Sequence, residues 1–203
     1  MTDLWPAHSG TADSLLNTFE TSLTAAAGEM IRCVTTEDAV NKSRQLMQQL
    51  CGKRVGIVQR TWIQEVSEKW TDIEKIVPPA PEHPEEVSLR EMAEIDIGVV
   101  HAEYLLADTG SCVIASPTAF DRLLCYLSPV CFVFAKKETL RPHLPAAWPE
   151  ISARMVHPND PVGAMNQSGE FLIVTGPSRT ADIEKILILG VHGPKRLIVF
   201  VVE

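Results

Sequence analysis

A segment near the end of the chain, TGPSRTADIEKILILGVHGP (residues 175–194), holds the side chains best suited to binding a ligand. The candidate ligand-binding residues in it are Thr175, Gly176, Ser178, Arg179 and Thr180. Hydroxyls donate hydrogen bonds, and a guanidinium can pair with a carboxylate or a phosphate through two parallel hydrogen bonds. These residue types in one loop indicate a site for a small anion.

A helix is expected directly after Thr180, and its free amide groups would strengthen such a site. Asp182 would then fall in the first helical turn, where its carboxylate weakens the attraction for an anion. Asp182 could instead hold Arg179 in an ion pair that only fixes the loop. Anion binding and this structural pairing are left as equal alternatives.

His192 lies between Gly190 and Gly193, which allow a ligand to approach closely. Histidine exchanges protons near neutral pH, so His192 and Asp182 are the candidate catalytic residues. If a single short helix separates them, Arg179, Asp182 and His192 face one pocket. The alternative is a histidine that packs against the end of the sheet with both ring nitrogens hydrogen-bonded.

A second turn lies in LLADTGSCVI (residues 105–114), where Gly110 can adopt a positive φ and Thr109 and Ser111 carry hydroxyls. Thr109, Gly110 and Ser111 are therefore further candidate ligand-binding residues, expected opposite the loop at 175–194. The simpler interpretation is a turn at the start of a strand, with Asp108 as a turn-forming residue.

The apolar pattern predicts the elements that position these loops. Helices are expected at residues 12–32, from Thr35 or Thr36 to about residue 50, at 61–70, after Ser88 and at 118–127. The helix at 61–70 has Thr61 and Gln64 at capping-box spacing. One or two helical turns are also expected just before residue 108. Strands are expected at residues 53–59, 73–77, 111–115, 130–136, 170–176 and 196–203. Residues 139–168 are expected to be irregular with one helix.

The strand segments are almost continuously apolar, which is typical of strands covered on both faces. The sequence therefore predicts an α/β fold, a three-layer sandwich with a mostly parallel or mixed sheet preceded by N-terminal helices. Residues 1–50 are expected to pack on the body or to extend from it, and residues 51–203 to form the α/β part of a single domain. Open sheets of this kind bind ligands outside the carboxyl ends of their strands, so the loop at 175–194 is expected there.

Composition excludes several classes of function. The chain of 203 residues has a net charge of -8 and no cluster of Lys and Arg, which argues against a nucleic-acid partner. No apolar run is long enough for a membrane span and no secretory signal is visible, so a cytoplasmic protein is expected. The 5 cysteines include no C-x-x-C pair and the 6 histidines are scattered, so no metal or cluster is expected in this chain.

Three motifs, ADTGS (107–111), TGPSRTADIE (175–184) and GVHGP (190–194), make the sequence resemble the lactate-utilisation protein C family, or LUD domain. The resemblance covers residues 95–203 well, and the first half only in its layout. Where the family more usually has Glu-Thr-Gly-Thr, this chain has Asp108 and Ser111, which keep a carboxylate and a hydroxyl.

The resemblance implies the fold shared by glucosamine-phosphate deaminase, ribose-phosphate isomerase, CoA transferases and 5-formyltetrahydrofolate cyclo-ligase. It also implies a component of L-lactate oxidation to pyruvate that works with iron-sulfur partner proteins, which would hold the clusters while this chain holds no cofactor. Two alternatives remain open: a free-standing ligase or transferase for a phosphate- or CoA-bearing substrate, and a pure interaction subunit. Whether the chain is itself an enzyme or a homo-oligomer is also left open.

Overall fold

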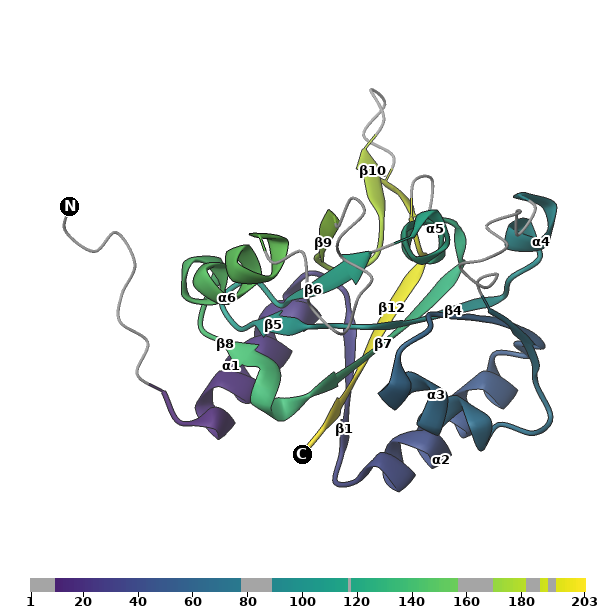
Figure 1. The fold of residues 1–203 in the computed structure, drawn as a ribbon, viewed down its shortest axis with the longest axis horizontal. Helices are drawn as coiled ribbons and strands as arrows, with labels where there is room; N and C mark the ends of the chain where they lie inside the picture. The colour runs from purple at the N-terminus through teal and green to yellow at the C-terminus, as the bar shows by residue number, and fades with distance from the viewer. Residues whose placement is uncertain (1–9, 78–88, 117, 157–169, 182–186, 190–192) are drawn as a thin grey trace.

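The computed structural model describes residues 10–77, 89–116, 118–156, 170–181, 187–189 and 193–203. Its main sheet has six strands in the spatial order β1-β12-β7-β4-β2-β3, and every neighbouring pair is parallel. Figure 1 labels β1, β12, β7 and β4 of this sheet. The strands are β1 (Glu29–Cys33), β2 (Arg54–Ile57), β3 (Glu74–Ile76), β4 (Ile97–His101), β7 (Val130–Lys136) and β12 (Arg196–Val202). The predicted α/β class is confirmed.

Helices cover both faces of this sheet. The helices are α1 (Ala12–Ala25), α2 (Thr36–Gln49), α3 (Thr61–Glu68), α4 (Leu89–Ala93), α5 (Ala119–Leu127) and α6 (Leu144–Val156), with a 3-10 turn η1 (Lys137–Thr139). Trp70, just after α3, packs on Phe134 of β7 from one side. From the other side α5 approaches so closely that a Cβ at Gly98 of β4 would lie 2.9 Å from the carbonyl oxygen of Leu124.

A smaller sheet and a hairpin extend from the main sheet. The smaller sheet has the order β8-β5-β6-β9, and a separate antiparallel hairpin pairs β10 with β11. Their bounds are β5 (Tyr104–Leu106), β6 (Ser111–Ser116), β8 (Leu140–Arg141), β9 (Glu170–Val174), β10 (Arg179–Ala181) and β11 (Leu187–Leu189). In Figure 1 the hairpin projects beyond the body on the side of α5.

Aromatic side chains from neighbouring strands form the centre of the core. Phe132, Phe134 and Phe200 are fully buried, and the rings of Phe134 and Phe200 stack with their centres 4.8 Å apart. The six residues after Arg196 in β12 are all buried, because β1 and β7 flank this strand and helices cover it. The prediction of a buried strand at 196–203 is therefore confirmed.

The predicted helix over residues 12–32 is too long. The helix ends at Ala25, Ala27 adopts a left-handed φ of 64°, and the amide of Gly28 donates to the carbonyl oxygen of Leu23 at 2.8 Å. The chain then enters β1, which pairs with β12 at the other end of the sequence. Met30 continues the helical spacing of apolar residues only by coincidence, and long-range pairing decides its conformation.

Two further local predictions are wrong. The segment before residue 108 forms strand β5 instead of a helical turn, because it pairs with β6 and β8. The expected capping box of α3 is absent: Arg60 occupies the N-cap position and makes no capping hydrogen bond with its side chain, and Thr61 is already inside the helix. By contrast, Thr118 and Asp121 form a complete capping box at the start of α5.

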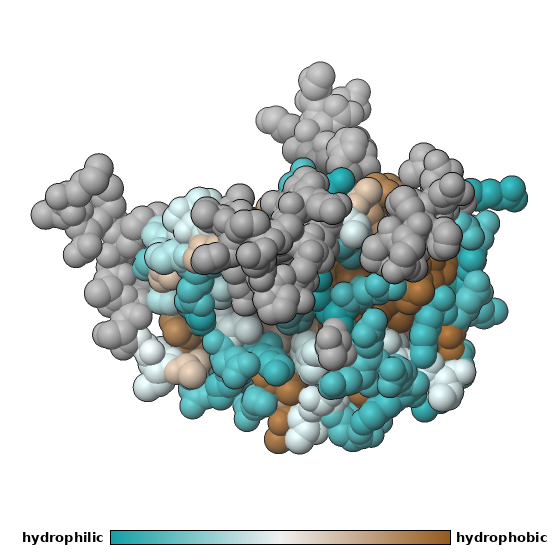
Figure 2. Space-filling model, in the orientation of Figure 1, coloured by the Kyte–Doolittle hydropathy of each residue, from teal (hydrophilic) through white to brown (hydrophobic). Residues whose placement is uncertain are grey.

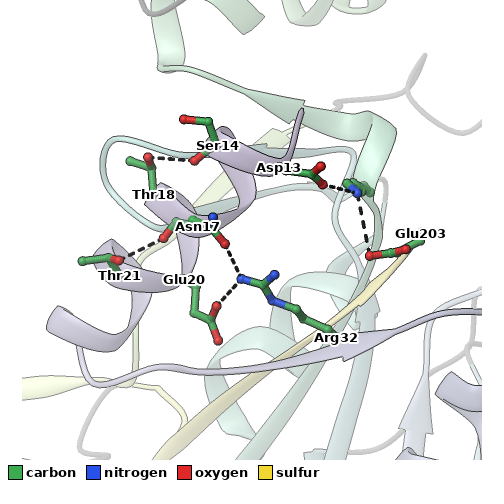
Figure 3. Close-up of polar contacts among 9 residues, drawn as sticks. Asp13, Ser14, Asn17, Thr18, Glu20, Thr21, Arg32 and Glu203 are labelled. Atoms are coloured by element: carbon green, nitrogen blue, oxygen red, sulfur yellow. Dashed lines mark hydrogen bonds and ion pairs between the residues drawn. The ribbon is translucent and has the colours of Figure 1, made fainter. Parts of the chain in front are cut away.

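Helix α1 packs on the body and is also held by polar contacts (Figure 3). Its buried residues are Leu16, Phe19 and Leu23. Arg32 of β1 binds Glu20 and also donates to Asn17 at 2.7 Å. Lys137 lies 2.6 Å from Asp13 and 3.7 Å from Glu203, so α1 is tied to the segments that follow β7 and β12.

Thr35 is the residue that caps α2, since its hydroxyl accepts a hydrogen bond from the amide of Asp38 at 3.1 Å. Replacing Thr35 with alanine leaves that amide without its protein partner, and we expect the free energy of unfolding to fall by about 1 kcal/mol. Thr36→Ala, one position further on, should change it by less than about 0.5 kcal/mol. Urea unfolding of the two variants checks this, and equal effects would mean that the cap contributes nothing.

Candidate functional site

A chain of hydroxyl groups joins the two turns that the sequence analysis singled out. The oxygens of Ser111 and Thr175 lie 2.6 Å apart, and Ser111 donates to Thr109 at 2.7 Å. Thr109 in turn donates to the carboxylate of Asp108 at 3.3 Å. Each hydroxyl can both donate and accept, so the chain can run in either direction. The structure therefore brings Thr109, Ser111 and Thr175 together.

Strand register explains why these residues meet. β6 and β9 are antiparallel with Cys112 opposite Val174, so one step further along the ladder Ser111 reaches Thr175. Ser111 is the first residue of β6, and Thr175 follows the last residue of β9. The same pairing brings the turn at residues 108–110 next to the loop that begins at Thr175.

Both turns pack against the end of α1, and this contact requires their glycines. Gly110 has a φ of +65°, and a Cβ there would lie 2.2 Å from the amide nitrogen of Leu23. Gly176 has a φ of +69°, and its Cβ would lie 2.2 Å from the carbonyl oxygen of Ala26. The hydroxyl of Ser22 also donates to the carbonyl of Asp108 at 3.1 Å. The glycines of both motifs thus serve backbone packing in this structure.

Thr175 also lines a cavity of about 420 Å³. Its lining residues are Ala26, Cys125, Tyr126, Ile173, Val174, Thr175, Gly176, Pro177, Ser178, Gly193 and Pro194. The amide of Ser178 donates to the carbonyl of Pro194 at 2.9 Å and closes one side of the loop. The face drawn in Figure 2 is mainly hydrophilic, with an apolar patch near α5, whose Tyr126 and Leu127 are about half exposed.

The position of this cavity differs from the prediction. Gly193 and Pro194 immediately precede β12, and Cys125 and Tyr126 lie shortly before β7. The cavity therefore lies at the amino ends of the parallel strands, not outside their carboxyl ends. The reason is that β9, which precedes the loop, belongs to the smaller sheet, where it pairs antiparallel with β6, so the rule for open parallel sheets does not apply to it.

The helix that was expected directly after Thr180 does not begin there, because Ala181 is still in β10. Arg179 and Thr180 belong to β10, where Arg179 pairs with Leu189 and Thr180 with Ile188 of β11. An anion site built on a helix N-terminus is therefore absent at β10. Asp182 and His192 lie outside the described residues, so their roles and their convergence with Arg179 stay predictions.

The described cysteines are free, and four of the five are buried. Burial raises the pKa of Cys33 to about 11 and that of Cys112 well above its ordinary value, which keeps both thiols protonated. The pKa of Cys131 is raised by a hydrogen bond with Cys125 and by burial. Across the described ranges, His, Cys, Asp and Glu side chains nowhere gather in threes as metal ligands would.

A polar cluster that the sequence analysis missed lies at the carboxyl ends of β2 and β4. His101 ends β4, and its Nδ1 lies 3.5 Å from Oε1 of Glu103. The Nε of Arg60, which follows β2, lies 4.0 Å from the same carboxylate oxygen. Arg60 and Glu103 closely follow two apolar runs of the sequence, but the strand order that brings them together is not visible there.

Comparison with known families identifies the chain. The family model of the LUD domain matches residues 16–202. The chain belongs to the LUD domain family. One LUD relative, Lactate utilization protein C of Halalkalibacterium halodurans, is 33% identical over 123 residues, which are 60% of this chain and 51% of that protein. The uncharacterized protein YkgG of Escherichia coli is 34% identical over 119 residues, 59% of this chain and 48% of that protein.

This LUD chain spans about half the length of the curated relatives that it matches. The crystal structure of a DUF162 family protein from Deinococcus radiodurans superimposes with a TM-score of 0.66 at 13% identity, covering 96% of this chain and 99% of that one. At this identity the likeness shows the fold alone. Among the described helices, none combines the length and the apolar composition that crossing a bilayer requires.

Proposed function

We propose that this LUD domain is a component of an L-lactate oxidation system, which converts lactate to pyruvate together with iron-sulfur partner proteins. The relatives named Lactate utilization protein C support a role in lactate utilisation. Oxidation of lactate releases two electrons and two protons, and in this division of labour the electrons pass to clusters in the partners. The chain itself then needs no cofactor, and its place is the cytoplasm.

The cavity beside Thr175 is the proposed binding site for a small anion, such as the carboxylate of lactate or pyruvate. Its volume of about 420 Å³ lies within the range of small-molecule sites. The observation that carries this proposal is the position of Thr175, which lines the cavity and whose hydroxyl is joined to Ser111 and, through Ser111, to Thr109. With an anion present, Thr175 donates to it while Thr109 donates to Ser111 and Ser111 donates to Thr175.

Removing the Thr175 hydroxyl tests the binding site. Thr175→Val keeps the shape of the side chain but removes the donor to the anion, and a hydrogen bond to a charged group contributes about 1.5–3 kcal/mol. We expect the affinity for L-lactate or pyruvate, measured by calorimetry, to fall at least about tenfold. Thr139→Val is the matched control, because the Thr139 hydroxyl donates to a backbone carbonyl away from the cavity.

Growth on L-lactate tests the role in the cell. A strain without the gene should fail to grow on lactate, and the wild-type gene and Thr139→Val should restore growth while Thr175→Val restores it poorly. If Thr175→Val restores growth fully and the protein still co-purifies with iron-sulfur proteins, the cavity has no role and the chain is an interaction subunit. Tight binding of ATP or acyl-CoA without any effect on lactate growth would instead indicate a ligase or transferase.

A further inference from the structure

The main sheet has a topological switch point between β2 and β4. The strand that follows β2 in the chain, β3, lies on one side of β2 in the sheet. The next strand of the sheet, β4, lies on the other side of β2, and β7 and β12 are added beyond β4. Sheets with this strand order bind ligands outside the carboxyl ends of the two strands at which the direction reverses. β2 and β4 are neighbouring parallel strands, with Val55 opposite Ile97 and Ile57 opposite Val99.

Charged side chains gather at this point. Arg60 follows β2, His101 and Glu103 come from the end of β4, and Lys136 ends β7. The side chains of Arg60, His101 and Glu103 are only 16%, 19% and 14% exposed. The Glu103 carboxylate holds both neighbours loosely, since its contacts to them are 3.5 and 4.0 Å long.

Two aromatic rings, those of His101 and Trp62, lie in this cluster. The rings of Trp62 and His101 are arranged edge-to-face, and their centres are 5.6 Å apart. The amine of Lys136 lies 5.9 Å from the centre of the Trp62 ring. The Nδ1 of His101 and the Nε1 of Trp62 are buried and have no hydrogen-bond partner among the described residues. Buried polar atoms are nearly always hydrogen-bonded, so two unpartnered nitrogens on neighbouring rings indicate that an acceptor binds there.

A further carboxylate near Arg60, that of Asp121, is engaged through one of its oxygens. It accepts hydrogen bonds from the amide and the hydroxyl of Thr118 within the capping box of α5. Burial raises the pKa of Asp121, and the charge of Arg60 is among the influences that oppose this rise. Oδ2 of Asp121 is thus engaged at the start of its helix, and the 4.0 Å contact of Arg60 with Glu103 is longer than a hydrogen bond.

We propose that Arg60, His101, Trp62 and Lys136 form a second binding site, for a small oxyanion that is a carboxylate or a phosphate, at the carboxyl ends of β2 and β4. An oxyanion supplies the acceptors that this cluster lacks, and a guanidinium binds it through paired hydrogen bonds. Glu103 is a positioning residue that holds Arg60 and His101 in place. The start of α3 at Thr61 adds free amide groups to the same edge. This site does not depend on the Thr175 cavity.

Titration of the whole protein with L-lactate and, separately, with inorganic phosphate tests the proposal. We expect the imidazole resonances of His101, assigned from the spectrum of His101→Gln, to shift with a dissociation constant of about 1 mM or tighter for at least one of the two anions. A response to lactate alone identifies a carboxylate ligand, and a response to phosphate alone identifies a phosphate ligand. No shift with either anion overturns the proposal, and this readout needs no destabilising variant.

A pair of arginine variants separates a specific site from general charge attraction. Arg60→Gln should weaken the response at least about tenfold. Arg54→Gln is the matched control, because Arg54 also pairs with carboxylates, those of Glu74 and Glu94, but lies at the opposite ends of the strands. Equal weakening by both variants would contradict the proposal. The response in Thr175→Val should equal that of the wild type, so failure of one site is distinguishable from failure of the other.

Discussion

Replacing Gly110 with alanine is expected to lower the free energy of unfolding by about 3–5 kcal/mol. The left-handed φ of +65° already costs a residue with a Cβ about 1–2 kcal/mol. The larger part comes from contact, because the new Cβ would lie 2.2 Å from the backbone nitrogen of Leu23 and 2.5 Å from its Cα. Backbone cannot move aside as a flexible side chain can, so α1 must shift and its buried residues lose packing.

Urea unfolding followed by circular dichroism measures this effect. Gly10→Ala is the matched control, since Gly10 precedes the same helix and its nearest neighbour is the Ser14 side chain at 3.2 Å. It should change the free energy of unfolding by less than about 0.5 kcal/mol. A loss below about 1 kcal/mol in Gly110→Ala would show that the turn moves freely away from α1, in contradiction to the packing described above.

Phe134→Ala is expected to be the most damaging change in the core, with a loss of about 3–5 kcal/mol. The ring is fully buried, stacks on Phe200 at 4.8 Å, and contacts Trp70 and Trp62 at 6.2 and 6.1 Å between centres. Removing it leaves a cavity between the central strands and α3. The core around it cannot collapse easily, because strand pairing fixes the backbone on both sides.

Phe134→Leu, which keeps most of the apolar volume, should lose only about 1–2 kcal/mol. Thermal unfolding of both variants, compared with the wild type, gives the two losses under identical conditions. Equal losses for alanine and leucine would show that the aromatic stacking, and not the filled volume, carries the effect. A loss below about 1 kcal/mol for alanine would contradict a tightly packed centre.

Elements with a strong local pattern could be predicted from the sequence. The segment VCFVFAK forms β7, and the run after Arg196 forms β12, because both are apolar enough to require cover on two faces. Thr118 and Asp121 determine the start of α5 through contacts three residues apart. In each case the stabilising interactions are local or depend on burial alone, and both are visible in the sequence.

Elements that depend on distant pairing could not be predicted. β1 pairs with β12, and its register joins Glu29 to Ile198, more than 160 residues along the chain. β9 reads as a buried strand but pairs with β6 on one side only within the described residues, and Ile173 is 49% exposed. An apolar run thus indicates a strand without showing which sheet it joins.

The candidate site was predicted only in part, because its position also depends on which strands pair over long distances. The meeting of Ser111 with Thr175 follows from two motifs that each end or begin a strand, and the sequence analysis placed these motifs opposite one another. The edge of the sheet on which they lie was predicted wrongly, because the membership of β9 in the smaller sheet is a matter of topology. The switch point beside Arg60 and His101 was missed because strand order is invisible in the sequence.

The order of the main sheet also bears on how the protein is made. β12 is the last strand in chain order, yet it lies between β1 and β7. On the ribosome both neighbours are synthesised well before it, so β7 must wait with one edge unpaired and β1 without either of its edges paired in this sheet. Such edges attract other chains, and pairing over long distances in sequence is slow. A newly made chain therefore keeps these edges exposed to other chains until β12 has been made and paired.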